Sequence, residues 1–252
     1  MNTLVYDQLR HFATYYETSD FLVGDPSWFM HQVRGSDNQE AMAFIASALS
    51  YGNRKQFMMR IKDILDWSNG SIDSWVRNGF FNEHFTVDDN SCFYRLYTCA
   101  TMHKFLIAYQ HLLLSYGSLG AYVRERAKTG LEAVEAICLH FNSEGVSGVV
   151  PKDAQSACKR VCMFLRWMVR TDSPVDLGLW SDFIDRRTLI MPLDTHVLSQ
   201  AYRLGLINSK TASMSAAIRL TNVLAEVFPD DPLRGDFALF GYGVNANSSK
   251  DT

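Results

Sequence analysis

Apolar residues recur at helical spacing along most of this chain, and no stretch of any length alternates as a half-buried strand does. The chain has 6 prolines and 15 glycines among 252 residues, too few for a turn-rich β fold. Hydrophobic residues make up 47% of the sequence, which is enough to build a sizeable core. We therefore expect an all-α fold.

We expect residues 1–244 to form one unit, made of two helical subdomains with a cleft between them. One subdomain is expected to be built mainly from residues 35–150. The other is expected to contain residues 1–34 and residues 151–244. Residues 245–252 are polar and are expected to form a flexible tail.

Two long helices are expected on the basis of their apolar spacing. The first covers the segment from Cys92 to Ser115, and the second covers residues 153–170. Both are bounded by glycine or proline, which supports helix ends nearby.

The charge balance and the cysteines exclude several classes of protein. The formal net charge is −3, so any binding of nucleic acid must come from a local basic patch. The five cysteines form no CxxC pair, and we expect no disulfide framework, zinc site, iron–sulfur cluster or other cofactor. No signal peptide or membrane-spanning run is recognisable. A monomer in the cytoplasm, with reduced thiols and no membrane partner, is expected.

The expected helix from Gln155 to Arg170 carries a row of cations. Lys159, Arg166 and Arg170 project within about 40° of one another, on a different face from the apolar stripe. No acidic residue of the same helix lies nearby, so the row is a candidate anion site. A solvated basic face is the alternative that the residues alone leave open. The apolar stripe itself is formed by Cys158, Val161, Cys162, Leu165, Met168 and Val169.

The segment Met191-Pro192-Leu193-Asp194-Thr195-His196-Val197 predicts the start of a helix. Pro192 disfavours helical backbone at the residue before it, and Asp194 is a preferred N-cap. A plain cap and a catalytic carboxylate are both compatible with this pattern. His196 points about 100° away from its neighbours, so we expect it to pack or to contact a phosphate.

A further acid and aromatic pair lies near the C-terminus. Asp231 and Pro232 precede a helix in which Asp236 and Phe240 lie one turn apart on one face. Such a pair can accept hydrogen bonds from a flat ligand and stack on it. The alternative is a core aromatic beside a surface acid.

These segments, in this order, resemble the helix-hairpin-helix DNA glycosylase superfamily. In that superfamily a Leu/Val-Asp-Thr/Val-His turn caps a helix and its aspartate is catalytic, and Leu193-Asp194-Thr195-His196 matches this turn. The segment from Phe44 to Tyr51 resembles the first core helix of the superfamily, with Tyr51 in place of a glutamine.

Residues of about 25–243 look more particularly like an uncharacterised bacterial family similar to the archaeal 8-oxoguanine DNA glycosylases. This resemblance implies that Lys159 is the nucleophile and Asp194 the catalytic carboxylate, with Lys152 as a rival nucleophile. It also implies that Asp236 and Phe240 hold the damaged base.

The remaining implied contacts are to DNA phosphates. They would come from the side chains of Arg166, Arg170 and His196, and from a loose hairpin at Gly145 and Gly148.

The activity implied is that of a DNA glycosylase and AP lyase acting on double-stranded DNA that contains an oxidised purine such as 8-oxoguanine. The base would be extruded into a pocket before Lys159 attacks the sugar. Two alternatives stay open. One is a DNA-binding or damage-sensing module of the same fold without catalysis, and the other is a helical protein that binds a purine or a protein but no DNA.

Overall fold

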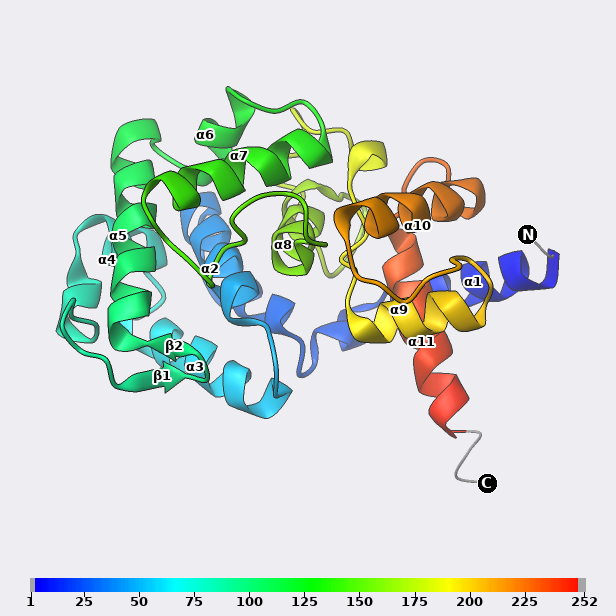
Figure 1. Cartoon of the computed structure of the whole chain (residues 1–252), viewed down its shortest axis with the longest axis horizontal. Helices are drawn as coiled ribbons and strands as arrows, with labels where there is room; N and C mark the ends of the chain where they lie inside the picture. Colours follow the sequence, from blue (N-terminus) through cyan, green and yellow to red (C-terminus); the bar gives the residue numbers. More distant parts are fainter. Residues whose placement is uncertain (1–2, 249–252) are drawn as a thin grey trace. The chain divides into compact units, whose positions relative to one another are not determined.

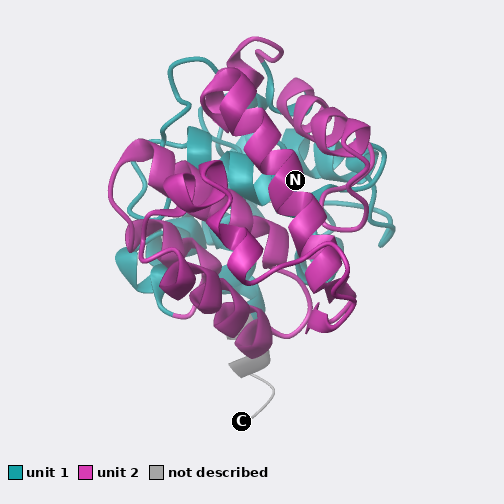
Figure 2. Cartoon of the chain, turned by 90° about the vertical axis from the view of Figure 1, so that its left-hand side faces the viewer, with its two compact units in different colours: residues 1–23, 129–131, 154–252 teal, residues 24–128, 132–153 magenta. Residues whose placement is uncertain are grey.

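A computed structural model of the chain describes residues 3–248, and it describes side chains for residues 3–243. The described residues are mostly helical, which confirms the all-α expectation (Figure 1). Strand is limited to one small two-stranded sheet among the described residues. The chain divides into two compact units, coloured separately in Figure 2. Unit 1 contains residues 1–23, 129–131 and 154–252, and unit 2 contains residues 24–128 and 132–153.

The division differs from the expected subdomains at residues 129–131, which lie in unit 1, and at residues 151–153, which lie in unit 2. Residues 24–34 also lie in unit 2 and not in unit 1 as expected. The reason is packing, because η2 (Pro26–His31) contacts α2 (Ser36–Leu49) and α3 (Arg54–Trp67). At the other end, α11 (Arg234–Ser248) continues through residue 248. The rest of the expected polar tail, residues 249–252, lies outside the described residues.

Unit 2 is built around α2, whose last ten residues are all buried. Its Phe44 contacts the rings of Phe105, Tyr109 and Phe141, which come from the helices that surround it. The surrounding elements are α4 (Ile72–Arg77), η3 (Phe80–Glu83), α5 (Cys99–Tyr116), α6 (Leu119–Arg124) and α7 (Gly130–Ser143). The buried Glu40 accepts hydrogen bonds from the first two backbone N–H groups of α6, so the helix N-terminus compensates its charge.

The expected helix from Cys92 to Ser115 was wrong in its first turns. The chain forms a hairpin there, with β1 (Cys92–Tyr94) antiparallel to β2 (Tyr97–Thr98). Arg95, in the connecting turn, has a left-handed φ of 52°, which cannot continue a helix. The helix α5 starts only after Thr98, whose hydroxyl caps it by accepting from the N–H of Thr101.

Unit 1 is built around α8 (Lys159–Val169), in which every residue from Val161 to Val169 is buried. The other elements of unit 1 are α1 (Thr3–Tyr16), η1 (Ser19–Leu22), η4 (Arg186–Thr188), α9 (Thr195–Arg203), α10 (Met214–Val227) and α11. Helix α1 packs along α11, and α9 also contacts α11. The close approach requires glycine at position 241, because a Cβ there would lie 2.2 Å from the ring of Tyr16.

The helix expected over residues 153–170 is shorter than expected and starts at Lys159. Cys158 has a left-handed φ of 44°, and the preceding residues form turns and loop. Gln155 is instead tied to the start of α10, since its carbonyl accepts from the N–H of Met214. The predicted apolar stripe is confirmed, because all six of its residues are buried.

Candidate active site

Asp194 is the N-cap of α9, as the sequence predicted. Its backbone is extended, and its Oδ1 accepts from the N–H groups of His196 at 2.9 Å and Val197 at 2.8 Å. One carboxylate oxygen therefore satisfies two of the N–H groups that a helix start leaves unpaired. The second oxygen, Oδ2, takes no part in the cap and faces another residue.

That residue is Lys159, the first residue of α8. The Lys159 Nζ lies 3.5 Å from Asp194 Oδ2, and the two side chains are 33% and 37% exposed. The structure thus brings together the two residues proposed as nucleophile and carboxylate, from helices that start 36 positions apart.

Asp236, on the first turn of α11, is close enough to this pair to interact with it electrostatically. Burial raises its pKa, the Arg166 guanidinium opposes this rise, and the negative charge of Asp194 adds to it. Lys159 also acts on it electrostatically, so the carboxyl group senses both members of the pair. The guanidinium of Arg166 donates a hydrogen bond from Nη1 to Asp236 Oδ2. Asp236 therefore combines a side chain that is only 18% exposed with a raised affinity for a proton.

The predicted phosphate contacts of Arg166 and Arg170 were wrong for this structure. Their side chains are only 3% and 1% exposed, and both are paired with carboxylates inside unit 1. A buried guanidinium without counter-charges would be strongly destabilising, so these arginines need the acids that surround them. Neither is available to a DNA phosphate.

The acids form a continuous buried network with these arginines. Asp176 accepts from Arg166 Nε at 3.3 Å and from Arg170 Nη1. Asp231 accepts from Arg170 Nε at 3.0 Å and Nη2 at 2.8 Å, and Glu17 accepts from Arg170 Nη2 at 2.5 Å. The ring of Phe237 lies 4.8 Å from the guanidinium carbon of Arg166. We term these six residues the buried ion network: Glu17, Arg166, Arg170, Asp176, Asp231 and Asp236.

Glu17, Asp176 and Asp231 were not predicted from the sequence as members of this network. The sequence did hold one indication of such a network. If a helix with an apolar stripe is buried on all sides, its arginines need acids nearby as counter-charges. Asp176 follows Arg170 by only six positions. The other two acids come from segments more than 60 positions away, which only the tertiary fold brings close.

The aromatic partner expected for the base, Phe240, packs at the edge of an aromatic group. Its ring meets Tyr16 at 5.6 Å and Phe21 at 5.1 Å between centroids, both edge-on. It is partly exposed, so stacking on a base stays a prediction. The side chain of His196 is exposed and its imidazole lies beside α11 at Gly243, and its expected phosphate contact also stays a prediction.

The loose hairpin at Gly145 and Gly148 was expected to contact phosphates, and this prediction was wrong for the N–H of Gly145. Its N–H donates to Asn142 O, and the next N–H, of Val146, donates to Phe141 O. With its φ of 70°, Gly145 ends α7 in the manner of a Schellman cap, so its donor is used. Gly148 has a φ of 81°, and its carbonyl accepts from the Tyr97 hydroxyl. The rival nucleophile Lys152 is exposed and lies in unit 2.

Tyr51, which stands where the resemblance implies a glutamine, has a structural use in unit 2. The Tyr94 hydroxyl donates to Tyr51 O, and the Tyr51 hydroxyl accepts from the N–H of Leu96 at 3.3 Å. The Arg95 guanidinium carbon lies 5.6 Å from the centre of the Tyr51 ring. Tyr51 therefore fixes the turn of the β1–β2 hairpin.

A model of the family described as "Protein of unknown function (DUF2400)" matches residues 25–245. The chain belongs to the DUF2400 family. Comparisons of this DUF2400 protein with curated proteins and with solved structures gave no match. Within the part of the chain that the structure describes, no helix is long and apolar enough to cross a membrane. The same residues contain no group of three or more His, Cys, Asp or Glu side chains suited to a metal ion.

Proposed function

We propose that this DUF2400 protein is a DNA glycosylase with AP lyase activity that excises an oxidised purine such as 8-oxoguanine from double-stranded DNA, on a fold of the helix-hairpin-helix glycosylase kind. The observation that carries the proposal is the pairing of Lys159 Nζ with Asp194 Oδ2 at 3.5 Å. Both groups are partly exposed at helix starts, which suits a nucleophile and a carboxylate that must reach a sugar.

In the proposed reaction the base is extruded from the duplex, at a cost of a few kcal/mol in lost stacking and pairing. The unprotonated amine of Lys159 forms a bond to the sugar C1′. The bond between C1′ and the base breaks, and the base leaves with the electron pair and takes up a proton. The sugar ring then opens to a Schiff base on Lys159, and loss of a C2′ proton expels the 3′-phosphate.

Asp194 has two tasks in this scheme, one for each oxygen. The capping bonds to Oδ1 hold the carboxylate in place, and Oδ2 accepts the proton that Nζ loses. The fixed negative charge also stabilises the positive charge that develops on the sugar. Because the cap is made by the backbone of α9, the carboxylate does not need to reorganise during the reaction.

Asp236 and Phe240 are the proposed contacts to the base. A carboxyl group with a raised pKa can either accept a hydrogen bond from a base N–H or donate its own proton. Phe240 offers an aromatic ring one helical turn further along α11. The anchoring of Asp236 by Arg166 keeps its position fixed without a ligand.

The test is borohydride trapping on a duplex that carries one 8-oxoguanine. We expect a covalent adduct with the wild-type protein and none with Lys159→Ala. Lys152→Ala is the matched control, because it removes an exposed lysine of unit 2, and it should trap as the wild type does. No adduct with the wild type, or full trapping by Lys159→Ala, would contradict the proposal.

A second substitution separates capping from catalysis at Asp194. Asparagine is as good an N-cap as aspartate, so Asp194→Asn keeps the helix start and removes the charge. We expect unchanged thermal unfolding and a loss of excision of about 100-fold or more. Unchanged excision would remove Asp194 from the mechanism.

One observation favours the alternative of a non-catalytic DNA-binding or damage-sensing module. The predicted phosphate contacts of Arg166, Arg170 and Gly145 are all used within the protein, which leaves fewer groups to hold a substrate in place for reaction. This alternative predicts salt-dependent binding to duplex DNA without release of any modified base.

A further inference from the structure

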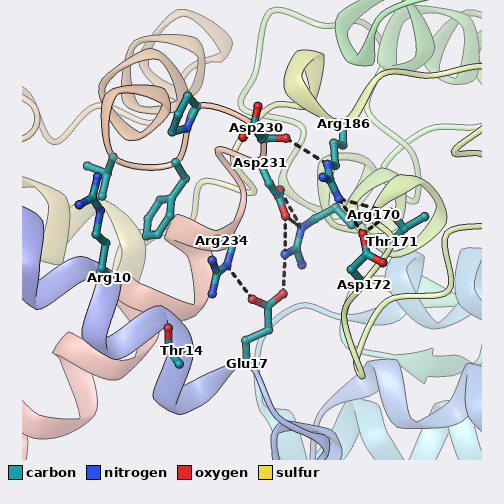
Figure 3. Close-up of a pocket in the computed structure, with 13 residues that line it drawn as sticks. Arg10, Thr14, Glu17, Arg170, Thr171, Asp172, Arg186, Asp230, Asp231 and Arg234 are labelled. Atoms are coloured by element: carbon teal, nitrogen blue, oxygen red, sulfur yellow. Dashed lines mark hydrogen bonds and ion pairs between the residues drawn. The ribbon is translucent and has the colours of Figure 1, made fainter.

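A hollow of about 620 Å³ lies in unit 1 (Figure 3), and neither Lys159 nor Asp194 lines it. It is formed by α1, the residues that follow α8, η4 and the α10–α11 loop. Three of its lining arginines have solvent-accessible side chains, and each comes from a different element. Arg10 comes from α1 and is exposed, and Arg186 from η4 and Arg234 from α11 are partly exposed. No residue proposed for catalysis lines it.

These three arginines retain unused hydrogen-bond donors. Arg10 lies near the ring of Tyr6 and has no carboxylate partner among the described residues. Arg234 donates from Nε to Glu17, which leaves its two terminal nitrogens. Arg186 donates from Nε to Asp230 O and from Nη1 to Thr171 and Asp172, which leaves Nη2. Guanidinium groups with unused N–H groups are the usual protein contacts for phosphate.

The hollow is lined by four arginines and four carboxylates. Glu17 pairs with both Arg170 and Arg234, and Asp231 pairs with Arg170; the two acid side chains are 9% and 10% exposed. Asp172 is 85% exposed on its side chain and is paired with Arg186, and Asp230 is exposed. The lining is therefore formally neutral, and what it offers an anion is the set of unused N–H groups on Arg10, Arg186 and Arg234.

The arrangement of the arginines favours an extended anion over a compact one. In Figure 3 they lie across the hollow in the order Arg10, Arg234, Arg186, and they do not converge on one point. A single phosphate ion would be held by groups that point at one centre, whereas a chain of phosphates needs donors spread along its path.

We propose that this hollow binds the phosphate backbone of a DNA strand, through Arg10, Arg234 and Arg186. The choice of DNA as the ligand rests on the proposed function, but the hollow is separate from the site at Lys159 and Asp194. Arg170 lines the hollow at the C-terminal end of α8, and Lys159 opens the same helix. The two ends are about 16 Å apart at 1.5 Å per residue, so one duplex can contact both.

The test is fluorescence anisotropy with an undamaged duplex, titrated between 50 and 200 mM salt. The variants are Arg10→Gln, Arg186→Gln and their combination, and the control is Arg219→Gln, which removes an exposed arginine of α10 outside the hollow. The slope of log K against log salt is negative, and each lost phosphate contact should reduce its magnitude by about 0.9. We expect the double variant to reduce the magnitude of this slope by nearly two, and Arg219→Gln to change it little.

Two results would overturn the inference. One is a combined variant that binds duplex with the wild-type affinity and slope. The other is a thermal shift by inorganic phosphate that the variants abolish while duplex binding is unchanged, which would mean a small-anion site. Neither result affects borohydride trapping by Lys159. By contrast, a wild-type protein that neither binds duplex nor forms an adduct would contradict the proposed function itself.

Discussion

Replacing Asp176 by asparagine tests whether the buried ion network holds unit 1 together. The Asp176 side chain has no exposed surface and accepts from both Arg166 and Arg170. Asparagine keeps the shape and removes the charge, which leaves two buried guanidinium groups with one counter-charge fewer. Breaking a buried ion pair from one side costs about 3–5 kcal/mol.

The expected loss is at the lower end of that range, about 3 kcal/mol. Arg170 keeps Asp231 and Glu17, and Arg166 keeps Asp236, so neither guanidinium is left without an acid. A loss of this size is still a large fraction of the 5–15 kcal/mol that stabilises an ordinary domain. The free energy of unfolding would be measured by urea denaturation followed by circular dichroism.

Asp172→Asn is the control for this measurement. It removes a carboxylate that is 85% exposed and paired with a single arginine at the surface, which is worth at most about 1 kcal/mol. If Asp176→Asn costs no more than Asp172→Asn, the buried network contributes little and the reasoning is refuted.

Three further predictions concern the same unit and the thiols. Because burial raises the pKa of Asp236, the folded state holds its proton at a pH where the unfolded carboxyl has lost it, so the stability contributed by this group falls as pH rises above the ordinary aspartate pKa of about 4. Asp236→Asn should flatten this fall in the urea-derived stability, and an unchanged slope would contradict the assignment. Gly241→Ala should lower the free energy of unfolding by about 1–3 kcal/mol, because the new methyl group meets the ring of Tyr16 at 2.2 Å, and a melting temperature equal to the wild type would show that α1 can move away freely. Of the five free cysteines only Cys92 is exposed, so a thiol reagent should modify one group quickly in the native protein and five in denaturant; rapid native labelling of more than one would contradict the burial.

The fold class could be predicted from the sequence because helical spacing of apolar residues is a local property. The N-cap at Asp194 could be predicted for the same reason, since an aspartate after a proline-containing turn caps the helix that follows it. The hairpin at residues 92–98 could not, because its apolar residues also suit a helix. Its turn depends on Arg95 in a left-handed conformation held against Tyr51, which is distant in sequence.

The candidate site was predicted in part from the sequence. The predicted phosphate contacts of Arg166 and Arg170 failed because both side chains are buried. Lys159 and Asp194 were named from the sequence, and the structure places them together. Arg166 and Arg170 share a helix face with Lys159, but Lys159 lies at the open end of α8 while the arginines lie along its buried length. Periodicity gives the direction of a side chain around its helix and says nothing of what covers that side.

Glu17 gives the N-terminal helix a role that the family match does not cover. The match begins at residue 25, whereas α1 ends at Tyr16 and its neighbour Glu17 pairs with both Arg170 and Arg234. A fragment starting at residue 25 would retain every residue proposed for catalysis. It would nevertheless expose the aromatic side of α11 and leave Arg170 with one acid fewer. A functional fragment must therefore include Glu17, because Arg170 at the end of α8 needs this acid. Its boundary lies upstream of the segment that the family model matches.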